Sequence, residues 1–149
     1  MIIVGHTNPH DPQATALLQQ SHALMTSLFP PEDNFYLSID DLCADNIHFF
    51  TAREGDTVLG TGALMVKDGY GEIKSMFVSE VARGRGVADA ILRQLEDHAK
   101  TEFLRMLKLE TGNVLYAAHR LYTRHEFVPC GPFGDYIDAP SSIFMEKAL

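Results

Sequence analysis

The residues with the clearest chemical signature are alternating arginines and glycines, Arg83-Gly84-Arg85-Gly86, between a strand-forming segment and an amphipathic helix. Glycines let a backbone come close to a ligand, and the free N–H groups of a helix's first turn attract phosphate. The two arginines add charge-assisted hydrogen bonds. The segment therefore predicts a binding site for a phosphate or pyrophosphate group.

Two common nucleotide-binding loops do not fit this segment. A Walker loop needs G-x-x-x-x-G-K-[ST], which the sequence lacks. A dinucleotide fingerprint needs three glycines, but only Gly84 and Gly86 are in place and position 89 is Asp. Two glycines at this spacing, taken alone, are also typical of a plain turn.

The segment from Arg83 to Ala88 resembles motif A of the Gcn5-related N-acetyltransferases (GNAT superfamily), whose pattern is [Q/R]-x-x-G-x-[G/A]. The strand before it ends in Met76-Phe77-Val78, similar to the apolar-apolar-Val step of that family. A second block, Ala118 to Phe127, resembles the family's A-x-x-L-Y-x-x-x-G-F and differs only at Glu126. A non-glycine there would cost about 1 kcal/mol in the left-handed conformation that the usual glycine adopts. The resemblance covers residues 47–149 and points to a small bacterial single-domain member, with strings similar to auxin-acetylating types.

The resemblance implies a GNAT-type fold: a mixed α/β domain with a mostly antiparallel central sheet, splayed at the coenzyme site and flanked by helices. It implies acetyl-coenzyme A as co-substrate, bound through its pyrophosphate by motif A and through its pantetheine arm by the splayed strand. The expected coenzyme-binding residues are Met76, Phe77, Val78, Arg83, Gly84, Arg85, Gly86, Val87, Ala88, Asp89, Asn113 and Tyr122. Asn113 stands two residues before the position where the family often has asparagine.

Acetyl transfer to an amine also needs proton transfer, since a lysine-like ammonium has a pKa of about 10.4. The resemblance assigns Tyr122 as the acid for the leaving thiolate, although a tyrosine there could simply pack in the core. Glu72 is the first candidate base. It stands six residues before Val78, as the catalytic glutamate does in histone-acetyltransferase members of the family, and apolar neighbours would raise its pKa. It could equally be a half-exposed strand glutamate paired with a lysine. Glu110 is the second candidate and could act through water. Many members of the family use no single base.

The N-terminal elements that precede these residues are read from periodicity and breakers. Asp11 caps a helix that begins at Pro12 and ends before Pro30-Pro31. A capping-box pattern, Ser38-x-x-Asp41, predicts a second short helix. Strands are predicted over Met1–Thr7, Ile47–Arg53, Thr57–Val66 and Gly71–Ser79, the last three as an antiparallel meander.

The C-terminal half alternates helices and strands. A helix has its apolar face from Val87 to Ala99, and a second helix is predicted over Val114–His125 after a turn at Thr111-Gly112-Asn113. The remaining strands are predicted over Leu104–Leu109, Phe127–Cys130 and Ser142–Lys147. No linker divides the chain, so residues 1–149 are expected to form one mixed α/β domain.

Composition narrows the choice of partners. The 149 residues carry a net charge of −8, so a nucleic-acid partner is not expected. No signal peptide or membrane span is recognisable, and the two cysteines, Cys43 and Cys130, are expected to be reduced and buried in a cytoplasmic monomer or homodimer. The seven histidines form no H-E-x-x-H motif, so no metal site is expected.

Charge also bears on the acceptor. Residues 1–66 hold one basic and eight acidic residues, a net charge of −7. Acids beside the cleft would favour a cationic acceptor, whereas surface acids would serve solubility alone. The sequence therefore predicts an acetyl-coenzyme A-dependent N-acetyltransferase acting on a small amine by direct transfer. The alternative is a non-catalytic acyl-coenzyme A sensor or interaction module on the same fold.

Overall fold

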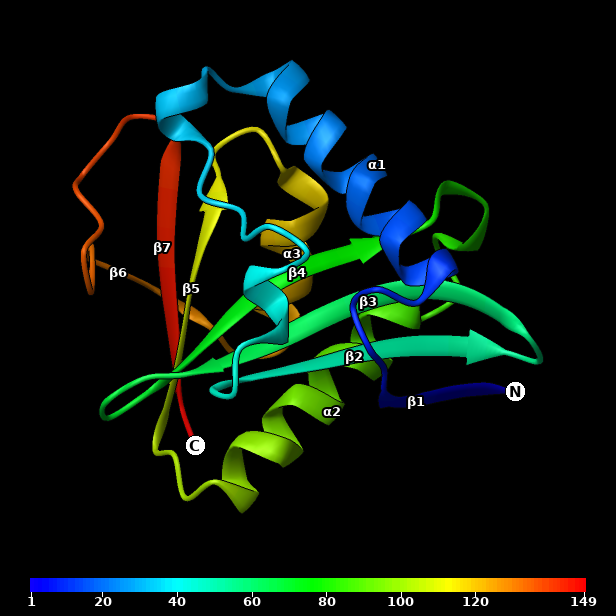
Figure 1. Ribbon diagram of the computed structural model, residues 1–149. Helices are drawn as coiled ribbons and strands as arrows, with labels where there is room; N and C mark the ends of the chain where they lie inside the picture. Colours follow the sequence, from blue (N-terminus) through cyan, green and yellow to red (C-terminus); the bar gives the residue numbers. More distant parts are fainter.

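A single seven-stranded sheet, in the order β1-β2-β3-β4-β5-β7-β6, runs through the computed structural model, which describes residues 1–149 (Figure 1). Every neighbouring pair is antiparallel except β4 and β5, which are parallel. The strands are β1 (Ile2–His6), β2 (Ile47–Glu54), β3 (Thr57–Val66), β4 (Gly71–Val78), β5 (Met106–Gly112), β6 (Val128–Cys130) and β7 (Ser142–Ala148). The meander over residues 47–79 and the mixed α/β architecture are confirmed.

Three helices cover the sheet: α1 (Pro12–Leu28), α2 (Val87–Thr101) and α3 (Tyr116–Arg124). Helix α1 begins as the sequence predicts, with Pro12 in its first turn and the Asp11 carboxylate accepting a hydrogen bond from the Ala14 N–H at 3.1 Å. It packs on the face of the sheet that carries Phe49, and its Leu18 belongs to the same small apolar cluster as Phe49. None of the helices is both long and apolar enough to span a bilayer.

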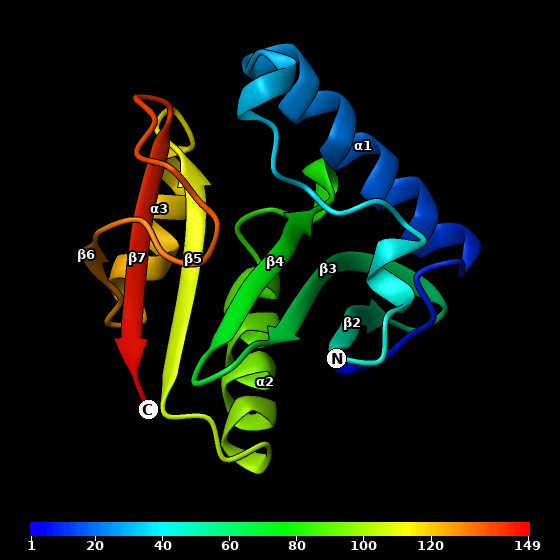
Figure 2. The same cartoon turned by 60° about the vertical axis from the view of Figure 1, so that its left-hand side comes forward.

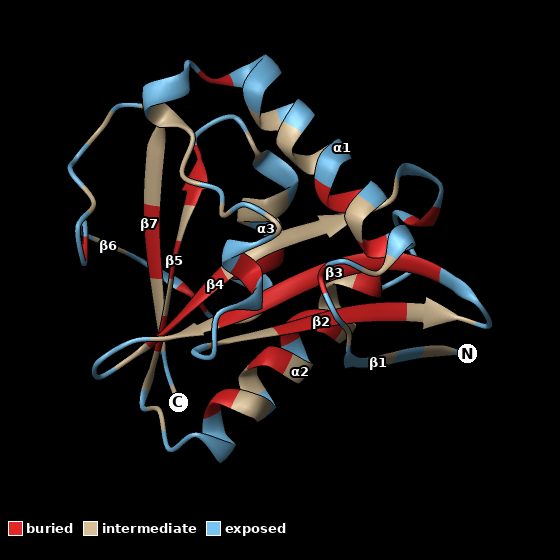
Figure 3. Ribbon diagram, in the orientation of Figure 1, coloured by how far each residue is buried: buried red, intermediate tan, exposed pale blue.

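The larger core lies on the opposite face of the sheet, under α2 and α3. Adjacent strand residues point to opposite faces, so Phe50 joins this core while Phe49 packs under α1. Ile91, Leu92 and Leu95 of α2 are fully buried here. Figure 3 shows buried parts of this helix, in red, recurring along its length. The expected apolar face of this helix is therefore confirmed.

The sheet opens between its two central strands. β4 and β5 are paired only at Gly71–Leu107 and Glu72–Lys108, and beyond this point they diverge (Figure 2). The register between β3 and β4 also shifts between Thr61 and Ala63, and Ser75 has a φ of 56°. A bulge of this kind bends the strand that carries it. The splayed central sheet expected from the resemblance is thus present.

Several predicted boundaries are corrected. The Ser38–Asp41 capping box does form, with the Asp41 N–H donating to Ser38 Oγ at 3.0 Å, but only a 3-10 turn (Asp41–Cys43) follows it. The chain must turn extended at Ala44 to begin β2 at Ile47, so tertiary pairing outweighs the helical signal. A second 3-10 turn spans Pro31–Asp33.

Other corrections lie in the C-terminal half and at the cysteines. The fifth strand starts later than predicted and continues through Gly112, because Gly112 pairs with Ser142 of β7. Helix α3 correspondingly begins at Tyr116. Both cysteines are free as expected, but neither is buried, since Cys43 is exposed and Cys130 half-buried.

Candidate functional site

A cavity of about 850 Å³ lies where β4 and β5 separate. It extends from the C-terminal end of α1 and the chain after it to the N-terminus of α2, with α3 along one side. The divergence of the two strands creates this space, because the edge of β4 that faces β5 has no strand partner beyond Glu72. The cavity is therefore the natural place to look for a bound substrate.

One end of the cavity is formed by the glycine-arginine loop. Gly84 and Gly86 have φ values of 78° and 79°, the left-handed region that favours glycine, and Gly86 is the N-cap of α2. No side chain caps this helix, so the N–H groups of Val87, Ala88 and Asp89 are free to meet an anion. Most of the predicted loop residues line the cavity, namely Arg83, Gly84, Gly86, Val87, Ala88 and Asp89.

Arg85 lies apart from them. Its guanidinium pairs with Glu54 at the end of β2, and it does not line the cavity. The hydrogen bond and the charge of this carboxylate raise the pKa of Arg85, and both side chains are partly exposed. Arg85 therefore contacts the β2–β3 turn in this structure, while Arg83 is the arginine of the loop that faces the cavity.

Asp89 links α2 to α3 at the wall of the cavity. Its carboxylate accepts hydrogen bonds from Arg124 at 3.0 and 3.2 Å and lies 2.8 Å from His125 Nε2. Burial alone would raise the pKa of Asp89, but the hydrogen bonds from His125 and Arg124 outweigh it, and the pKa lies below its ordinary value. Asp89 is therefore an ionised cross-link as well as a residue of the cavity wall.

The opposite wall includes the predicted strand residues Met76, Phe77 and Val78. Beyond β4, the Ser79 N–H donates to Leu59 O at 2.8 Å. Successive N–H groups along a strand point to opposite edges, so the Val78 N–H faces away from β3, toward the cavity. This leaves a backbone donor on the free edge of β4.

Tyr122 of α3 closes the inner side of the cavity. Only 5% of the residue is exposed, yet it lines the cavity, and its ring packs edge-on to Phe127. Burial, with a smaller contribution from Glu110, strongly raises the pKa of the Tyr122 hydroxyl. The phenol is therefore held in its protonated form.

The two predicted glutamates have different surroundings. Glu110 of β5 lines the cavity, accepts a hydrogen bond from Ser142 Oγ at 2.9 Å, and burial raises its pKa. Glu72 is only 4% exposed, lies 3.5 Å from Lys74 Nζ, and does not line the cavity. Its Oε2 accepts a 2.6 Å hydrogen bond from the Tyr136 hydroxyl. Glu110 is thus the glutamate with access to a ligand.

Sequence reasoning missed part of the network around Glu72. Lys74 Nζ donates to Tyr136 Oη at 3.0 Å and to Phe35 O at 2.9 Å, and so ties β4 to two loops. Burial, followed by Glu72, strongly raises the pKa of Tyr136, which stays protonated. Tyr136 lies in the loop over residues 131–141, which is rich in Gly, Pro and Asp, and no local pattern in this loop indicates the contact.

Four buried side-chain polar atoms have no hydrogen-bond partner, and three belong to residues of this cavity: Asn34 Oδ1, Ser75 Oγ and Ser141 Oγ. The Asn34 amide is oriented by its Nδ2, which donates to the carbonyls of Phe29 and Pro30. Buried polar groups usually find partners in a folded protein. Their gathering here indicates a site built to meet a polar ligand.

The acidic residues of the N-terminal part of the chain do not gather around the cavity. Of the eight acids in residues 1–66, only Asp33 lines it, and four basic residues do so as well. Most of the N-terminal negative charge therefore lies on the surface outside the site. Asn113 is exposed and also lies outside the cavity wall, with its N–H donating to Ser141 O.

Comparison with known proteins was consistent across sequence and structure. Residues 14–127 match the model of the Acetyltransferase (GNAT) family. The chain is 37% identical to an IAA acetyltransferase of Azospirillum brasilense, covering 99% of this chain and 98% of that protein. It is also 37% identical to a Bacillus subtilis protein named uncharacterized N-acetyltransferase YsnE, covering 92% of this chain and 93% of that protein.

Solved structures extend this similarity to the fold. A Klebsiella pneumoniae protein described as an acyl-CoA N-acyltransferase superposes with a TM-score of 0.84 at 28% identity, over 100% of this chain and 98% of that one. The PaiA N-acetyltransferase of Thermoplasma acidophilum, solved with coenzyme A, shares the fold with a TM-score of 0.77 at 14% identity, over 100% and 99% of the chains.

Proposed function

Because the chain belongs to the GNAT acetyltransferase family and is an acyltransferase, we propose that it transfers the acetyl group of acetyl-coenzyme A directly to the nitrogen of a small amine. One observation carries the proposal: a single cavity joins the uncapped N-terminus of α2 to Tyr122 and Glu110. An anion-binding end and a proton-transferring end in one cavity suit a reaction between a phosphate-bearing donor and a basic acceptor.

The coenzyme fits the donor end of the cavity. The N–H groups of Val87, Ala88 and Asp89 and the side chain of Arg83 would hold the pyrophosphate. The free edge of β4 offers backbone groups to the pantetheine arm, and the Val78 N–H is the donor in line for the carbonyl oxygen of the acyl group. Acetyl-coenzyme A would supply an activated thioester. The side chains of the protein would then need to orient it, take a proton from the acceptor ammonium and give one to the departing thiolate.

Two side chains would move the protons. Glu110, with its raised pKa and access to the cavity, is the base that would take a proton from the acceptor ammonium, directly or through water. Tyr122, held protonated by burial, would give its proton to the departing thiolate sulfur, and the second proton lost by the acceptor nitrogen as the amide forms would restore the tyrosine hydroxyl. Glu72 is engaged by Tyr136 and Lys74, so its role would be to position that network rather than to touch substrate.

The acceptor end favours an ammonium group. Asn34 Oδ1 is a buried acceptor without a partner, and both Asp33 and Glu110 line the same cavity. An ammonium nitrogen would supply the missing donor and meet carboxylate charge. The similarity to a protein named IAA acetyltransferase points instead to an acidic aromatic acceptor, for which Lys74 or Arg120 would be the cavity cations. We rank the amine first because it satisfies the orphaned Asn34 oxygen.

A matched pair of acceptors separates these two acceptor classes. One compound carries a free amine, and the other is the same compound with an added carboxylate. The simple amine should have the higher kcat/KM, and added salt should reduce the difference, since the Debye length falls from about 10 Å at 0.1 M to about 3 Å at 1 M. If the carboxylated compound is preferred at low salt, the acceptor instead binds beside the cavity cations, and the amine proposal is wrong.

Thiol release from acetyl-coenzyme A, measured with a panel of amines, tests the activity itself. Release that depends on both the amine and Tyr122 supports transfer. Tight coenzyme binding without amine-dependent release would favour the non-catalytic sensor. The sensor is not favoured, because the relatives are named as acetyltransferases.

A further inference from the structure

The fourth buried polar atom without a hydrogen-bond partner lies outside the acetyl-transfer cavity, at His98 Nε2. His98 belongs to the last turn of α2, about 17 Å from the start of this helix at 1.5 Å per residue. Two other side chains with metal-ligating atoms meet it there, His48 of β2 and Glu102 just after the helix. None of the three lines the large cavity.

The distances within this group resemble those between ligands of one metal ion. Glu102 Oε1 lies 3.4 Å from His48 Nε2 and 3.4 Å from His98 Nε2, and all three atoms fall within 4.8 Å of one another. Ligands at 2.0–2.2 Å in a tetrahedron are separated by about 3.3 Å. The Glu102 oxygen does not form a hydrogen bond with His98 Nε2 despite its position. The buried His98 nitrogen thus lacks a hydrogen-bond partner, and a metal ion bound among the three side chains would supply one.

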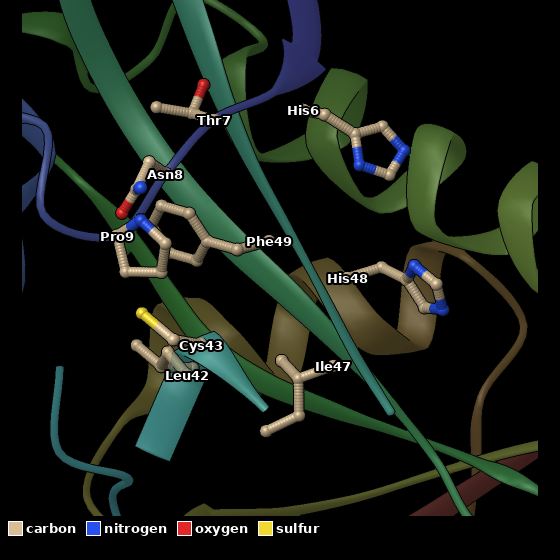
Figure 4. A pocket seen from close by; sticks show the side chains of 9 residues that line it. All are labelled: His6, Thr7, Asn8, Pro9, Leu42, Cys43, Ile47, His48 and Phe49. Carbon is tan, nitrogen blue, oxygen red and sulfur yellow. The ribbon is translucent and has the colours of Figure 1, made fainter. Parts of the chain in front are cut away.

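The fold fixes the two elements that carry the ligands. His98 and Glu102 are four residues apart, so they share one side of the last helical turn. His48 is in β2 between Ile47 and Phe49, and its ring turns to the face opposite Phe49, as Figure 4 shows. That is the face covered by α2, and the His48 and His98 rings lie 4.1 Å apart between centroids. The side chains of His48 and His98 are only 22% and 18% exposed.

His6 of β1 borders the group from the solvent side. Its ring centroid is 5.3 Å from that of His98 and 6.1 Å from that of His48. Figure 4 shows the His6 and His48 rings on the same side of their strands. Three protein ligands leave one tetrahedral position, which a water molecule would take.

We propose that His48, His98 and Glu102 form a binding site for a zinc-type divalent ion that joins the end of α2 to β2. Two imidazoles and one carboxylate suit zinc and its transition-metal neighbours, whereas calcium and magnesium prefer oxygen alone. The site lies outside the cavity that Tyr122 and Glu110 line, so its role would be structural rather than catalytic. Sequence spacing missed it because the ligands come from separate elements; the only local signal is the one-turn spacing of His98 and Glu102.

Calorimetric titration of the untagged, chelator-treated full chain with ZnCl₂ tests the proposal. One ion per chain should bind, and Co²⁺ in its place should give the visible absorption of a tetrahedral site. Glu102→Gln, at an exposed helix end, should lower Zn²⁺ affinity at least tenfold, and so should His48→Gln. His10→Gln removes an exposed histidine that pairs with Asp40, and it should leave the affinity unchanged.

Each result decides for or against the site. Circular dichroism of the variants without metal establishes that they are folded, and Glu102→Gln is the one least able to disturb the core. The assignment would be overturned if the parent protein bound no Zn²⁺, or if Glu102→Gln and His48→Gln bound Zn²⁺ as tightly as the parent. It would also be overturned if His10→Gln lost as much Zn²⁺ affinity as those two variants.

Discussion

The Thr61 hydroxyl of β3 donates a 2.8 Å hydrogen bond to the backbone carbonyl of Ser75 in β4, beside the place where the register of the two strands shifts. Thr61 is fully buried, and Ser75 adopts a positive φ that non-glycine residues rarely take. This hydrogen bond stabilises the bulge by satisfying a carbonyl that the shifted ladder leaves out. The course of β4, and with it the width of the cavity, therefore depends on a side chain in the neighbouring strand.

Thr61→Val keeps the shape of this side chain and removes the hydroxyl. The Ser75 carbonyl then loses its partner inside the protein, which should lower the free energy of unfolding by about 1–3 kcal/mol. Urea titration measures this loss, and steady-state kinetics should show a higher KM for acetyl-coenzyme A. Unchanged stability and KM would mean that β3 does not control the bulge.

Gly86→Asp places a negative charge at the N-cap of α2, where the pyrophosphate is expected. Affinity for acetyl-coenzyme A should fall at least tenfold, or about 1.4 kcal/mol, in a calorimetric titration. Gly86→Asn is the matched control, because it has the same size, tolerates the positive φ similarly and carries no charge. Equal affinities for the Asp and Asn variants would remove electrostatics from the explanation.

Tyr122→Phe removes one buried hydroxyl and keeps the ring that packs against Phe127. If the hydroxyl protonates the thiolate, kcat should fall about 10²-fold while coenzyme affinity stays the same. Rapid-quench measurement of the chemical step, together with calorimetry, separates the two effects. Lost affinity with normal turnover would assign Tyr122 to binding.

Glu110→Gln should make the folded protein more stable at neutral pH but lower its activity. Burial raises the pKa of Glu110 above 4.5, so the folded chain holds this proton more tightly than the unfolded chain does. Stability from this group is present below pH 4.5 and decreases as the pH rises through the raised pKa. The glutamine variant should therefore be more stable than the parent at neutral pH and equally stable below pH 4.5.

The same variant should be slow at every pH. In the parent protein, kcat should rise with pH as Glu110 loses its proton and becomes a base. A Glu110→Gln protein that keeps both the rate and the pH profile of the parent would exclude Glu110 as the base. Glu72→Gln provides the comparison, since Glu72 does not line the cavity.

Glu126→Gly addresses the residue at which the second family block departs from its pattern. Glu126 has a φ of 71° at the end of α3, the conformation in which glycine has no steric cost. Replacement with glycine should stabilise the folded protein by up to about 1 kcal/mol, seen as a higher Tm. Glu126→Ala keeps the steric cost and should give no such gain; an equal gain would point to charge instead.

Local signals predicted much of the fold. The Asp11 cap, the breakers at Pro30-Pro31 and the alternation in the meander all act within a few residues, and their elements are found where expected. The failures have longer range. Gly112 joins a strand through pairing with Ser142, and the turn after Ser38 is cut short because β2 must begin.

The site divides along the same line. Motif A and the strand before it are contiguous in sequence, so their approach to one cavity could be foreseen. Tyr136, which donates to Glu72, and the Phe35 carbonyl, which accepts from Lys74, lie in loops about 60 and 40 residues away, and nothing local predicts these contacts. Glu110 lines the cavity and Glu72 does not. This difference also depends on how the sheet packs, and the spacing of residues in the sequence does not reveal it.

The short pairing of β4 with β5 has a mechanical consequence. The two halves of the sheet share ladder bonds at only one end, around Glu72 and Lys108, and the Asp89–Arg124 contact bridges them at the other. The two halves can therefore rotate relative to each other about the β4–β5 pairing, and the Asp89–Arg124 contact limits this motion. A coenzyme bound between the halves would fix the angle between them. On this basis, we expect the coenzyme-bound chain to be the stiffer form, with slower amide exchange along the facing edges of both strands.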